Sequence, residues 1–495
     1  MGRDLILAID QGTTGTKVLL FDKESQIRAQ AYREITQYYP HPGWVEHDLK
    51  EIWNSVIQLI QEVLFNADKR DIMAIAITNQ RETAAVWDRK TGEPLAHAVV
   101  WQCRRSIEIC KELRNDGLED LFRRKTGLMI DPYFSGTKVK WLLDNVPGLK
   151  GKAKKGEVCF GTIDSWLLWN LTGGKVFATD YSNASRTLLY NIYELRWDNE
   201  ILQTLDIPRS MLADVFPSSG KFGSTAGLGK LLDGIPITGL IGDSQGALFG
   251  ETCFRPGMAK ATYGTGTSLM MYAGNKPITP STGLVSTLAW GIQNDISYAI
   301  EGIINVTGAT MQWLRDGLGI IDDVSKSGQI AGTLAGNEGV YLVPAFVGLC
   351  APYWDMEAKA LITGLTRGTK REHIIRAGLE SIAYQVRDVF ELIKSGSGIP
   401  LVSLRADGGA AANDFLMQFQ ADLLNVEVTR PHIREVSALG AAYLAGLAIG
   451  IWENTEQIAA TRNSERVFKP QIFNDTREKL YYEWKTAVKQ VLAHN

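Results

Sequence analysis

The sequence lacks the motifs by which many nucleotide- and metal-binding proteins are recognised. Its 495 residues contain no G-x-x-x-x-G-K-[ST] phosphate loop and no G-x-G-x-x-G dinucleotide fingerprint. The six histidines are scattered without the spacing of metal ligands. Any nucleotide site in this chain must therefore be built from other turns.

Charge of one sign and structural cysteines are also scarce. The formal net charge is −3 and no basic stripe occurs, so nothing favours binding to nucleic acid or to an anionic membrane. The cysteines are odd in number, widely spaced and free of any C-x-x-C pair: Cys103, Cys110, Cys159, Cys253 and Cys350. Reduced thiols in a cytoplasmic protein are expected, without disulfide bonds or zinc sites.

Long hydrophobic runs are missing as well. The N-terminus lacks the charged-then-apolar build of a signal peptide. The longest uncharged run, residues 436–452, is rich in Ala and Gly and shorter than the roughly 20 apolar residues of a membrane span. It predicts a tightly packed buried helix.

Strand-like and helix-like segments alternate along the chain, which predicts an α/β fold. The first half carries predicted strands and one predicted helix, the helix beginning with Asp48 and Glu51 at capping-box spacing: strands 5–9, 18–21, 27–32, 72–78 and 84–87, helix 48–65. The second half shows the same alternation of predicted elements, with strands 260–263, 269–272 and 401–406 and helix 414–424. Two related domains facing a central cleft are expected, 1–250 and 251–495, with a boundary near residues 244–256.

Three Gly- and Thr-rich turns follow predicted strands, at residues 10–17, 264–267 and 407–413. A phosphate chain needs several N–H donors close together, and small residues let the backbone approach it. Each turn alone is also compatible with an ordinary hairpin or a strand-to-helix turn. Three such turns, spread over both halves, favour a nucleotide.

The first turn has the most complete set of groups. Gly12 and Gly15 allow close approach, and Asp10 at the strand end can hold Mg²⁺. Hydroxyl donors and a positive charge complete the turn: Thr13, Thr14, Thr16 and Lys17.

Candidate acceptor-binding residues also follow predicted strands. Arg81 and Glu82 follow strand 72–78 and could bind neighbouring hydroxyls of a polyol, or form a simple loop ion pair. Trp101 ends the next strand, where core packing is the alternative. Asp243 follows strand 237–242 and could take a proton from an attacking hydroxyl, or cap a helix.

Together these segments resemble the glycerol kinases of the FGGY carbohydrate kinase family, which share the actin- and hexokinase-like (ribonuclease H-like) fold. The resemblance covers essentially the whole chain. It rests on AIDQGTTGTK (8–17), TNQRETAAVWD (78–88), VVWQCRR (99–105), TGLMIDPYFSGTKVKWLLD (126–144), TDYSNASRTLLYN (179–191), GDSQGALFGE (242–251), KATYGTGTS (260–268), GATMQWLRD (308–316), APYWD (351–355), ESIAYQVRDV (380–389) and DGGAAANDFLMQFQ (407–420).

The resemblance implies ATP, Mg²⁺ and glycerol as ligands, with Asp10 and Asp243 at the metal and Asp243 also the general base. The implied acceptor pocket consists of Arg81, Glu82, Trp101, Tyr133, Asp243 and Ser244. The implied nucleotide residues are Thr13, Thr14, Gly15, Lys17, Thr265, Gly308, Gln312, Gly409 and Asn413. The phosphoryl group would pass directly in line to glycerol, giving sn-glycerol 3-phosphate.

Some positions depart from the family pattern. Ser244 stands where a glutamine is usual, and Ser268 where an aromatic residue usually covers the substrate. A kinase for another polyol or a pentulose, such as erythritol or a pentitol, therefore stays open, as does an actin- or chaperone-like ATPase. Gly234 replaces an arginine of the loop that binds fructose 1,6-bisphosphate in regulated relatives, so this regulation is not expected.

The predicted C-terminal helix, residues 475–494, has a partly apolar face. Either packing against the core or a homo-oligomer, a dimer or a tetramer, would cover that face.

Overall fold

The computed structural model describes residues 4–65, 71–229, 232–279, 283–349, 351–353, 355, 357–462 and 466–492. The strands of its main sheet, in chain order, are β1 Leu5–Gln11, β2 Gly15–Phe21, β3 Ile27–Glu34, β5 Ile72–Asn79, β13 Ser219–Ser224, β14 Pro236–Gly242, β15 Met258–Tyr263, β16 Thr267–Gly274, β17 Val285–Ile292, β18 Asp295–Ile304, β21 Ser403–Asp407, β22 Glu427–Arg430 and β23 Arg466–Phe468. Shorter strands form five small pairs: β4 Glu46–His47, β6 Ala85–Asp88, β7 Ala98–Val99, β8 Val158–Gly161, β9 Ala178–Asp180, β10 Tyr190–Asn191, β11 Arg196–Trp197, β12 Asp214–Phe216, β19 Tyr341–Val343 and β20 Leu361–Thr363.

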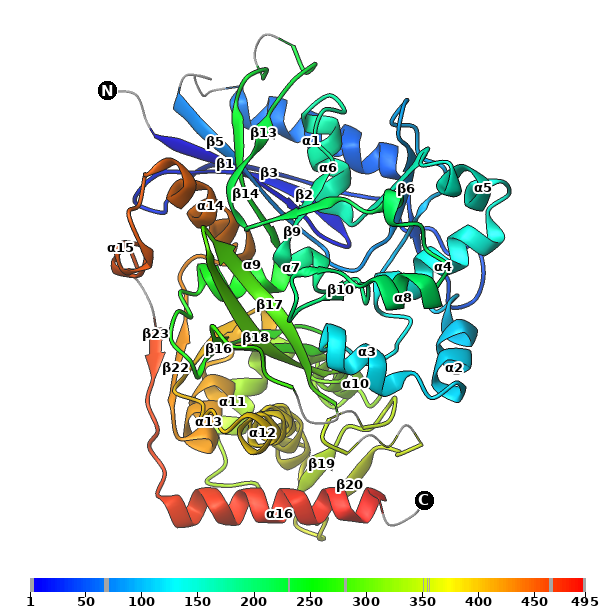
Figure 1. Ribbon diagram of the computed structural model, residues 1–495. Coiled ribbons are helices and arrows are strands. Elements are labelled where there is room, and N and C mark those ends of the chain that lie inside the picture. Colours follow the sequence, from blue (N-terminus) through cyan, green and yellow to red (C-terminus); the bar gives the residue numbers. More distant parts are fainter. Residues whose placement is uncertain are drawn as a thin grey trace.

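Helices surround this sheet (Figure 1). They are α1 Leu49–Leu64, α2 Ile107–Asn115, α3 Glu119–Thr126, α4 Ser135–Asn145, α5 Leu149–Lys154, α6 Ile163–Leu171, α7 Tyr181–Ala184, α8 Asn199–Thr204, α9 Asp243–Gly250, α10 Gly308–Asp316, α11 Ser327–Gly332, α12 Arg371–Ser397, α13 Asp414–Leu424, α14 Val436–Ile449, α15 Thr455–Ala460 and α16 Asn474–Leu492, with short 3₁₀ turns at η2 Arg209–Met211, η3 Val324–Lys326 and η4 Gly409–Ala412.

The main sheet contains the same strand arrangement twice. In the first half the order is β3-β2-β1-β5-β14, in which β1, β2 and β3 are antiparallel neighbours and β1, β5 and β14 run parallel. In the second half β18-β16-β15-β21-β22 has the same order and the same directions. The predicted pair of related α/β halves is therefore confirmed. Strands β13 and β17 join the halves through the single register pair Ser219 and Ile292.

The first half buries its strands on both faces. Leu5, Leu7 and Ile9 pack on the side of α1 and α6, whereas Ile6 and Ala8 pack on the side of α9 and α14. A strand covered on both sides is apolar at successive positions, which explains the unbroken run that predicted β1.

Helix α14 accounts for the uncharged run 436–452. It is apolar on all sides because it lies between α9 and strands β1, β5 and β14. In the part of the chain that the structure describes, no helix is long and apolar enough to cross a membrane. The prediction of a tightly packed buried helix is confirmed.

Two local predictions need a correction or an addition. Asp48 caps α1 by accepting from the Lys50 amide, but Glu51 does not complete a capping box, because its carboxylate binds the amide and hydroxyl of Thr36. Cysteines 103, 110, 159 and 253 are free and buried, and Cys350 lies outside the described residues.

The C-terminal helix α16 lies at the far end of the second half, along the bottom of Figure 1. Trp484 of this helix is fully buried, and its indole N–H donates to Asp388 on α12 at 2.9 Å. Tyr481 donates to the same carboxylate at 2.7 Å. Core packing thus covers the apolar face of α16.

Candidate active site

A cleft of about 1300 Å³ lies between the two halves and contacts all three predicted turns. Its walls are formed by the loops at the carboxyl ends of the parallel strands β5, β14 and β21 and by the hairpins β1–β2 and β15–β16. In α/β sheets this edge is where ligands bind, because the side chains that follow several strands converge there.

The first turn is a tight hairpin between β1 and β2. Asp10 and Lys17 are register partners, and Gly12 N–H donates to the Gly15 carbonyl at 2.9 Å. A Cβ on Gly15 would lie 2.5 Å from the Arg33 carbonyl oxygen, so this position requires glycine. Thr13 and Lys17 line the cleft.

Two threonines of this turn lie away from the cleft. Thr14 is exposed and is not part of the cleft wall. The prediction that Thr16 supplies a phosphate donor is wrong, because its buried hydroxyl pairs with Ser55 of α1 at 2.9 Å. Alternate residues of β2 face opposite sides of the sheet, and Thr16 faces α1.

Asp10 is partly buried and lies near two other carboxylates. Burial raises the pKa of Asp10 to about 7, and the charges of Asp243 and Glu435 add to this while Lys17 opposes it. Lys17 itself donates to Glu435, the residue before α14, at 2.6 Å. A divalent cation between Asp10 and Asp243 would relieve their repulsion, and phosphate oxygens and waters could complete its shell, so these residues fit Mg²⁺.

The second and third turns meet on the opposite wall. Thr265 and Gly409 line the cleft. Gly308 begins α10 against the second turn, where its N–H donates to the Gly264 carbonyl at 3.1 Å and a Cβ would come within 2.4 Å of that oxygen. Gln312 is exposed on α10, and Asn413 caps α13 by accepting from Leu416 N–H. Neither of these last two residues lines the cleft in this structure.

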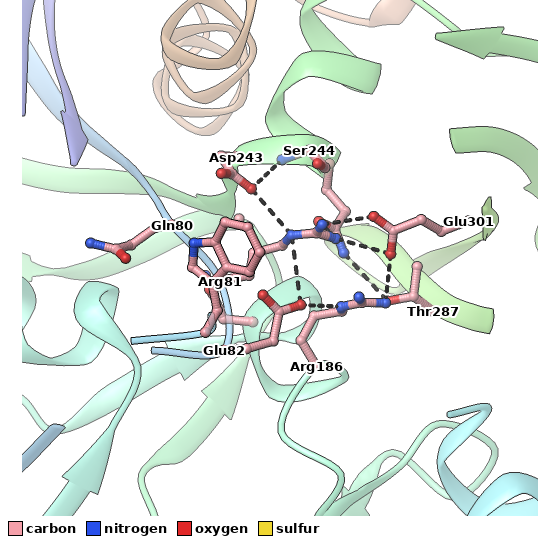
Figure 2. A network of polar contacts seen from close by, with 12 residues as sticks. Gln80, Arg81, Glu82, Arg186, Asp243, Ser244, Thr287 and Glu301 are labelled. Carbon is pink, nitrogen blue, oxygen red and sulfur yellow. Dashed lines mark hydrogen bonds and ion pairs between the residues drawn. The ribbon is translucent and has the colours of Figure 1, made fainter. Parts of the chain in front are cut away.

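Arg81 and Glu82 lie at the end of β5, at the centre of a buried ion-pair network (Figure 2). Arg81 Nε is 3.1 Å from Asp243 Oδ1, and Arg81 Nη2 is 2.7 Å from Glu301 Oε1. Glu82 Oε1 is 2.6 Å from Arg186 Nε. Glu82 has φ +60°, a left-handed conformation that is uncommon outside glycine and is typical of functional sites.

Trp101 and Tyr133 form an aromatic wall beside this network. Their ring centroids are 5.4 Å apart at an angle of 61°. The Trp101 indole N–H donates to Thr13 Oγ1 at 2.8 Å, so the predicted acceptor pocket touches the first phosphate turn directly. Trp101 follows the two-residue strand β7 and packs only partly against the core, so core packing does not explain it fully.

Asp243 opens α9 instead of capping it. Gly242 occupies the N-cap position, and Asp243 is the first helical residue, with its side chain 40% exposed to the cleft. Its Oδ1 atom accepts from the Ser244 amide at 2.6 Å. The helix N-terminus and Arg81 both place positive charge beside this carboxylate.

Sequence reasoning missed three charged residues at the cleft. Glu301 and Lys260 line it, and Arg186 forms an ion pair with Glu301. Lys260 is the single charge of β15, and Glu301 is the single charge in the buried part of β18, whose other charge, Asp295, lies at its exposed first position. Glu301 and Lys260 are each 1% exposed. A lone charge in a buried strand was the signal available for these two residues. Arg186 lies in an irregular segment and carried no comparable signal.

Residues 5–250 match the family model described as FGGY family of carbohydrate kinases, N-terminal domain, and residues 259–449 match its C-terminal domain. The chain belongs to this family. This FGGY kinase is 55% identical to the glycerol kinase of Caldanaerobacter subterraneus subsp. tengcongensis, with 98% of each chain covered. It is 53% identical to the glycerol kinase of Bacillus subtilis, with 99% of each chain covered.

The solved structures include a similar two-domain kinase. The crystal structure of Plasmodium falciparum glycerol kinase with ADP superimposes on this FGGY kinase with a TM-score of 0.96 and 38% identity, covering 99% of this chain and 98% of that one. The predicted actin- and hexokinase-like fold with two domains is thereby confirmed.

Proposed function

We propose that this FGGY kinase transfers the γ-phosphoryl group of ATP to a terminal hydroxyl of glycerol, forming sn-glycerol 3-phosphate. The observation that carries the proposal is that one cleft holds both the three phosphate turns and the Arg81–Asp243 pair. The relatives named glycerol kinase, similar over nearly their whole length, and the neighbour solved with ADP support the same assignment.

On the acceptor side, Arg81 and Glu82 hydrogen-bond neighbouring hydroxyls of glycerol, and Trp101 and Tyr133 cover its carbon atoms. The acceptor oxygen attacks the γ-phosphorus as the bond to ADP breaks. Asp243 takes the hydroxyl proton late in this step, because the transition state is loose. No covalent enzyme intermediate is required.

On the nucleotide side, Thr13, Gly15, Lys17 and Thr265 approach the phosphates from the two hairpins. Asp10 and Asp243 hold Mg²⁺, which neutralises charge on the phosphate oxygens when it is bound. The remaining proposed nucleotide residues are Thr14, Gly308, Gln312, Gly409 and Asn413. Four of these residues, Thr14, Gly308, Gln312 and Asn413, do not line the cleft in this structure. They reach the nucleotide when the two halves close.

We further propose that residues 1–250 form the domain with the acceptor pocket and first phosphate turn, and residues 251–495 the domain with the second turn and adenosine site. The enzyme would act in the cytoplasm. A dimer or tetramer stays a prediction, because α16 packs on its own core.

A panel of acceptors tests the glycerol assignment. Initial rates of ADP release would be measured with glycerol, erythritol, a pentitol and a pentulose at saturating Mg·ATP. We expect glycerol to give the highest kcat/KM. The panel is needed because Ser244 and Ser268, both small and polar, line the cleft. A pocket change of this kind shifts selectivity by roughly 1–3 kcal/mol.

A higher kcat/KM for a longer polyol or a pentulose would replace glycerol with that acceptor class. ATP turnover that no acceptor stimulates would contradict the kinase assignment itself.

A further inference from the structure

The acceptor pocket contains a buried residue from the far half of the chain. Glu301 lies on β18, and its side chain, although fully buried, borders the cleft behind Arg81. Its two oxygens contact two arginines, Arg81 Nη2 at 2.7 Å and Arg186 Nη1 at 2.7 Å (Figure 2).

We propose that Glu301 is a positioning residue of the acceptor pocket, which orients the Arg81 guanidinium for the acceptor hydroxyls. The inference rests on the proposed function in one respect, that the acceptor binds at Arg81. It adds that the second half of the chain supplies part of the pocket.

The geometry at Arg81 supports this role. A guanidinium is planar, so fixing two of its edges fixes the direction of every remaining N–H. Glu301 and Gln245 accept from the two terminal nitrogens, with Gln245 Oε1 at 3.2 Å from Nη1. The Nε edge then lies towards Asp243 at 3.1 Å. Arg81 Nε already lies 3.1 Å from Asp243 and 3.9 Å from Glu82, so without Glu301 the whole guanidinium could shift further onto these two carboxylates.

The electrostatics agree with the geometry. Burial alone would raise the pKa of Glu301, but Arg186 and Arg81 lower it to about 2, so Glu301 stays ionised. Two buried arginines thus face two buried carboxylates, Glu82 and Glu301. Asp243 contacts Arg81 as well, but its side chain stays partly exposed to the cleft, where the acceptor can reach it.

Arg186 completes the arrangement from the other side. It is fully buried, contacts both Glu82 and Glu301, and lies 5.9 Å from the Tyr133 ring centroid. It therefore links the strained Glu82, the aromatic wall and β18 without facing the acceptor.

A double-mutant cycle between Glu301 and Arg81 tests the proposal. The variants are Glu301→Gln, Arg81→Gln and the double variant, each measured with the acceptor that the wild type uses best. Glu301→Gln keeps the shape and removes the charge. We expect it to lower kcat/KM for the acceptor by about 10- to 100-fold, mainly through KM, while KM for ATP changes less than about two-fold.

The cycle separates positioning from direct contact. If Glu301 acts through Arg81, the double variant is no worse than Arg81→Gln alone. Fully additive losses would overturn the proposal, because Glu301 would then act independently of Arg81. An unchanged acceptor KM in Glu301→Gln would overturn it as well. If Glu301→Gln is insoluble, Glu301→Asp, which keeps the charge but not the reach, enters the same cycle with the same two outcomes.

Glu380→Gln is the matched control. Glu380 is also a buried carboxylate, paired with Arg376 at 2.6 Å in α12, and it does not line the cleft. We expect this variant to lose stability without a change in acceptor KM. If its acceptor KM rose as much as that of Glu301→Gln, loss of any buried ion pair would have this effect, and the proposal would be overturned. Failure of the wild type to phosphorylate glycerol concerns only the proposed function, because the cycle uses whichever acceptor is turned over.

Discussion

Asp243, the proposed general base, combines a fixed position with access to the cleft. It is held in place at the N-terminus of α9 beside Arg81, and its side chain still reaches the cleft. Its neighbours therefore position the carboxylate without covering it.

Replacing Asp243 by Asn should remove proton transfer and preserve the fold. The amide has nearly the same shape but cannot take the hydroxyl proton, so we expect kcat to fall by about 10²- to 10⁴-fold. Asp48→Asn is a suitable control, because Asp48 only caps α1 and Asn caps equally well. Steady-state rates with both variants check this, and a near-normal kcat in Asp243→Asn would refute the assignment of the base.

At the scale of elements, helices α9 and α14 are packed at backbone contact. A Cβ on Gly440 of α14 would lie 1.9 Å from the Gly246 carbonyl oxygen of α9, and a Cβ on Gly250 would lie 2.1 Å from the Val436 carbonyl oxygen. The N-termini of these helices bear Asp243 and Glu435, both at the cleft. The separation of the two helices thus sets the positions of two carboxylates that line the cleft.

Gly440→Ala should therefore affect both stability and catalysis. We expect a loss of roughly 1–3 kcal/mol, because the helices must move apart, and a lower kcat/KM for both substrates. Gly151→Ala at an exposed position of helix α5 is the matched control, since a Cβ there meets nothing within 4 Å and alanine favours helix by up to about 1 kcal/mol. Thermal denaturation and initial rates measure both effects, and an unchanged Tm for Gly440→Ala would contradict the expected clash.

The features that could be predicted from the sequence are those that depend on residues close together in the chain. The Gly- and Thr-rich turns and the strands around them were found in the sequence because they depend on neighbouring residues. Thr16 was misassigned because the same turn chemistry does not reveal which side chains face α1. The wider acceptor network could not be predicted, since Arg81 and Glu301 are 220 residues apart.

At the scale of the whole molecule, helix α14 from the end of the chain packs on β1, β5 and β14 of the first half and so ties the two halves together. The strands of the halves join through the single pair Ser219 and Ile292, and ion pairs such as Arg81–Glu301 cross the cleft region. A cleft of about 1300 Å³ separates the phosphate turns of one half from those of the other. Both sets must approach one nucleotide, so the halves are expected to close on their substrates.

Closure should be visible in solution. We expect the radius of gyration, measured by small-angle X-ray scattering, to fall when Mg·ADP and glycerol are added together, and to fall less with either alone. Water is excluded from the closed site, so ATP hydrolysis without an acceptor should be much slower than transfer. An unchanged radius of gyration with both ligands would contradict closure.

By itself, the sequence determined the α/β class, the doubled strand–turn units and the residues at the strand ends. Those features follow from periodicity and turn chemistry, which act over a few residues. Only the tertiary structure decided that Glu301 and Arg186 pair with Arg81 and Glu82, and that Lys17 pairs with Glu435 over 418 residues of chain. Such buried ion pairs form only when distant strands pack together, because a buried charge is stable only where folding brings it an opposite charge.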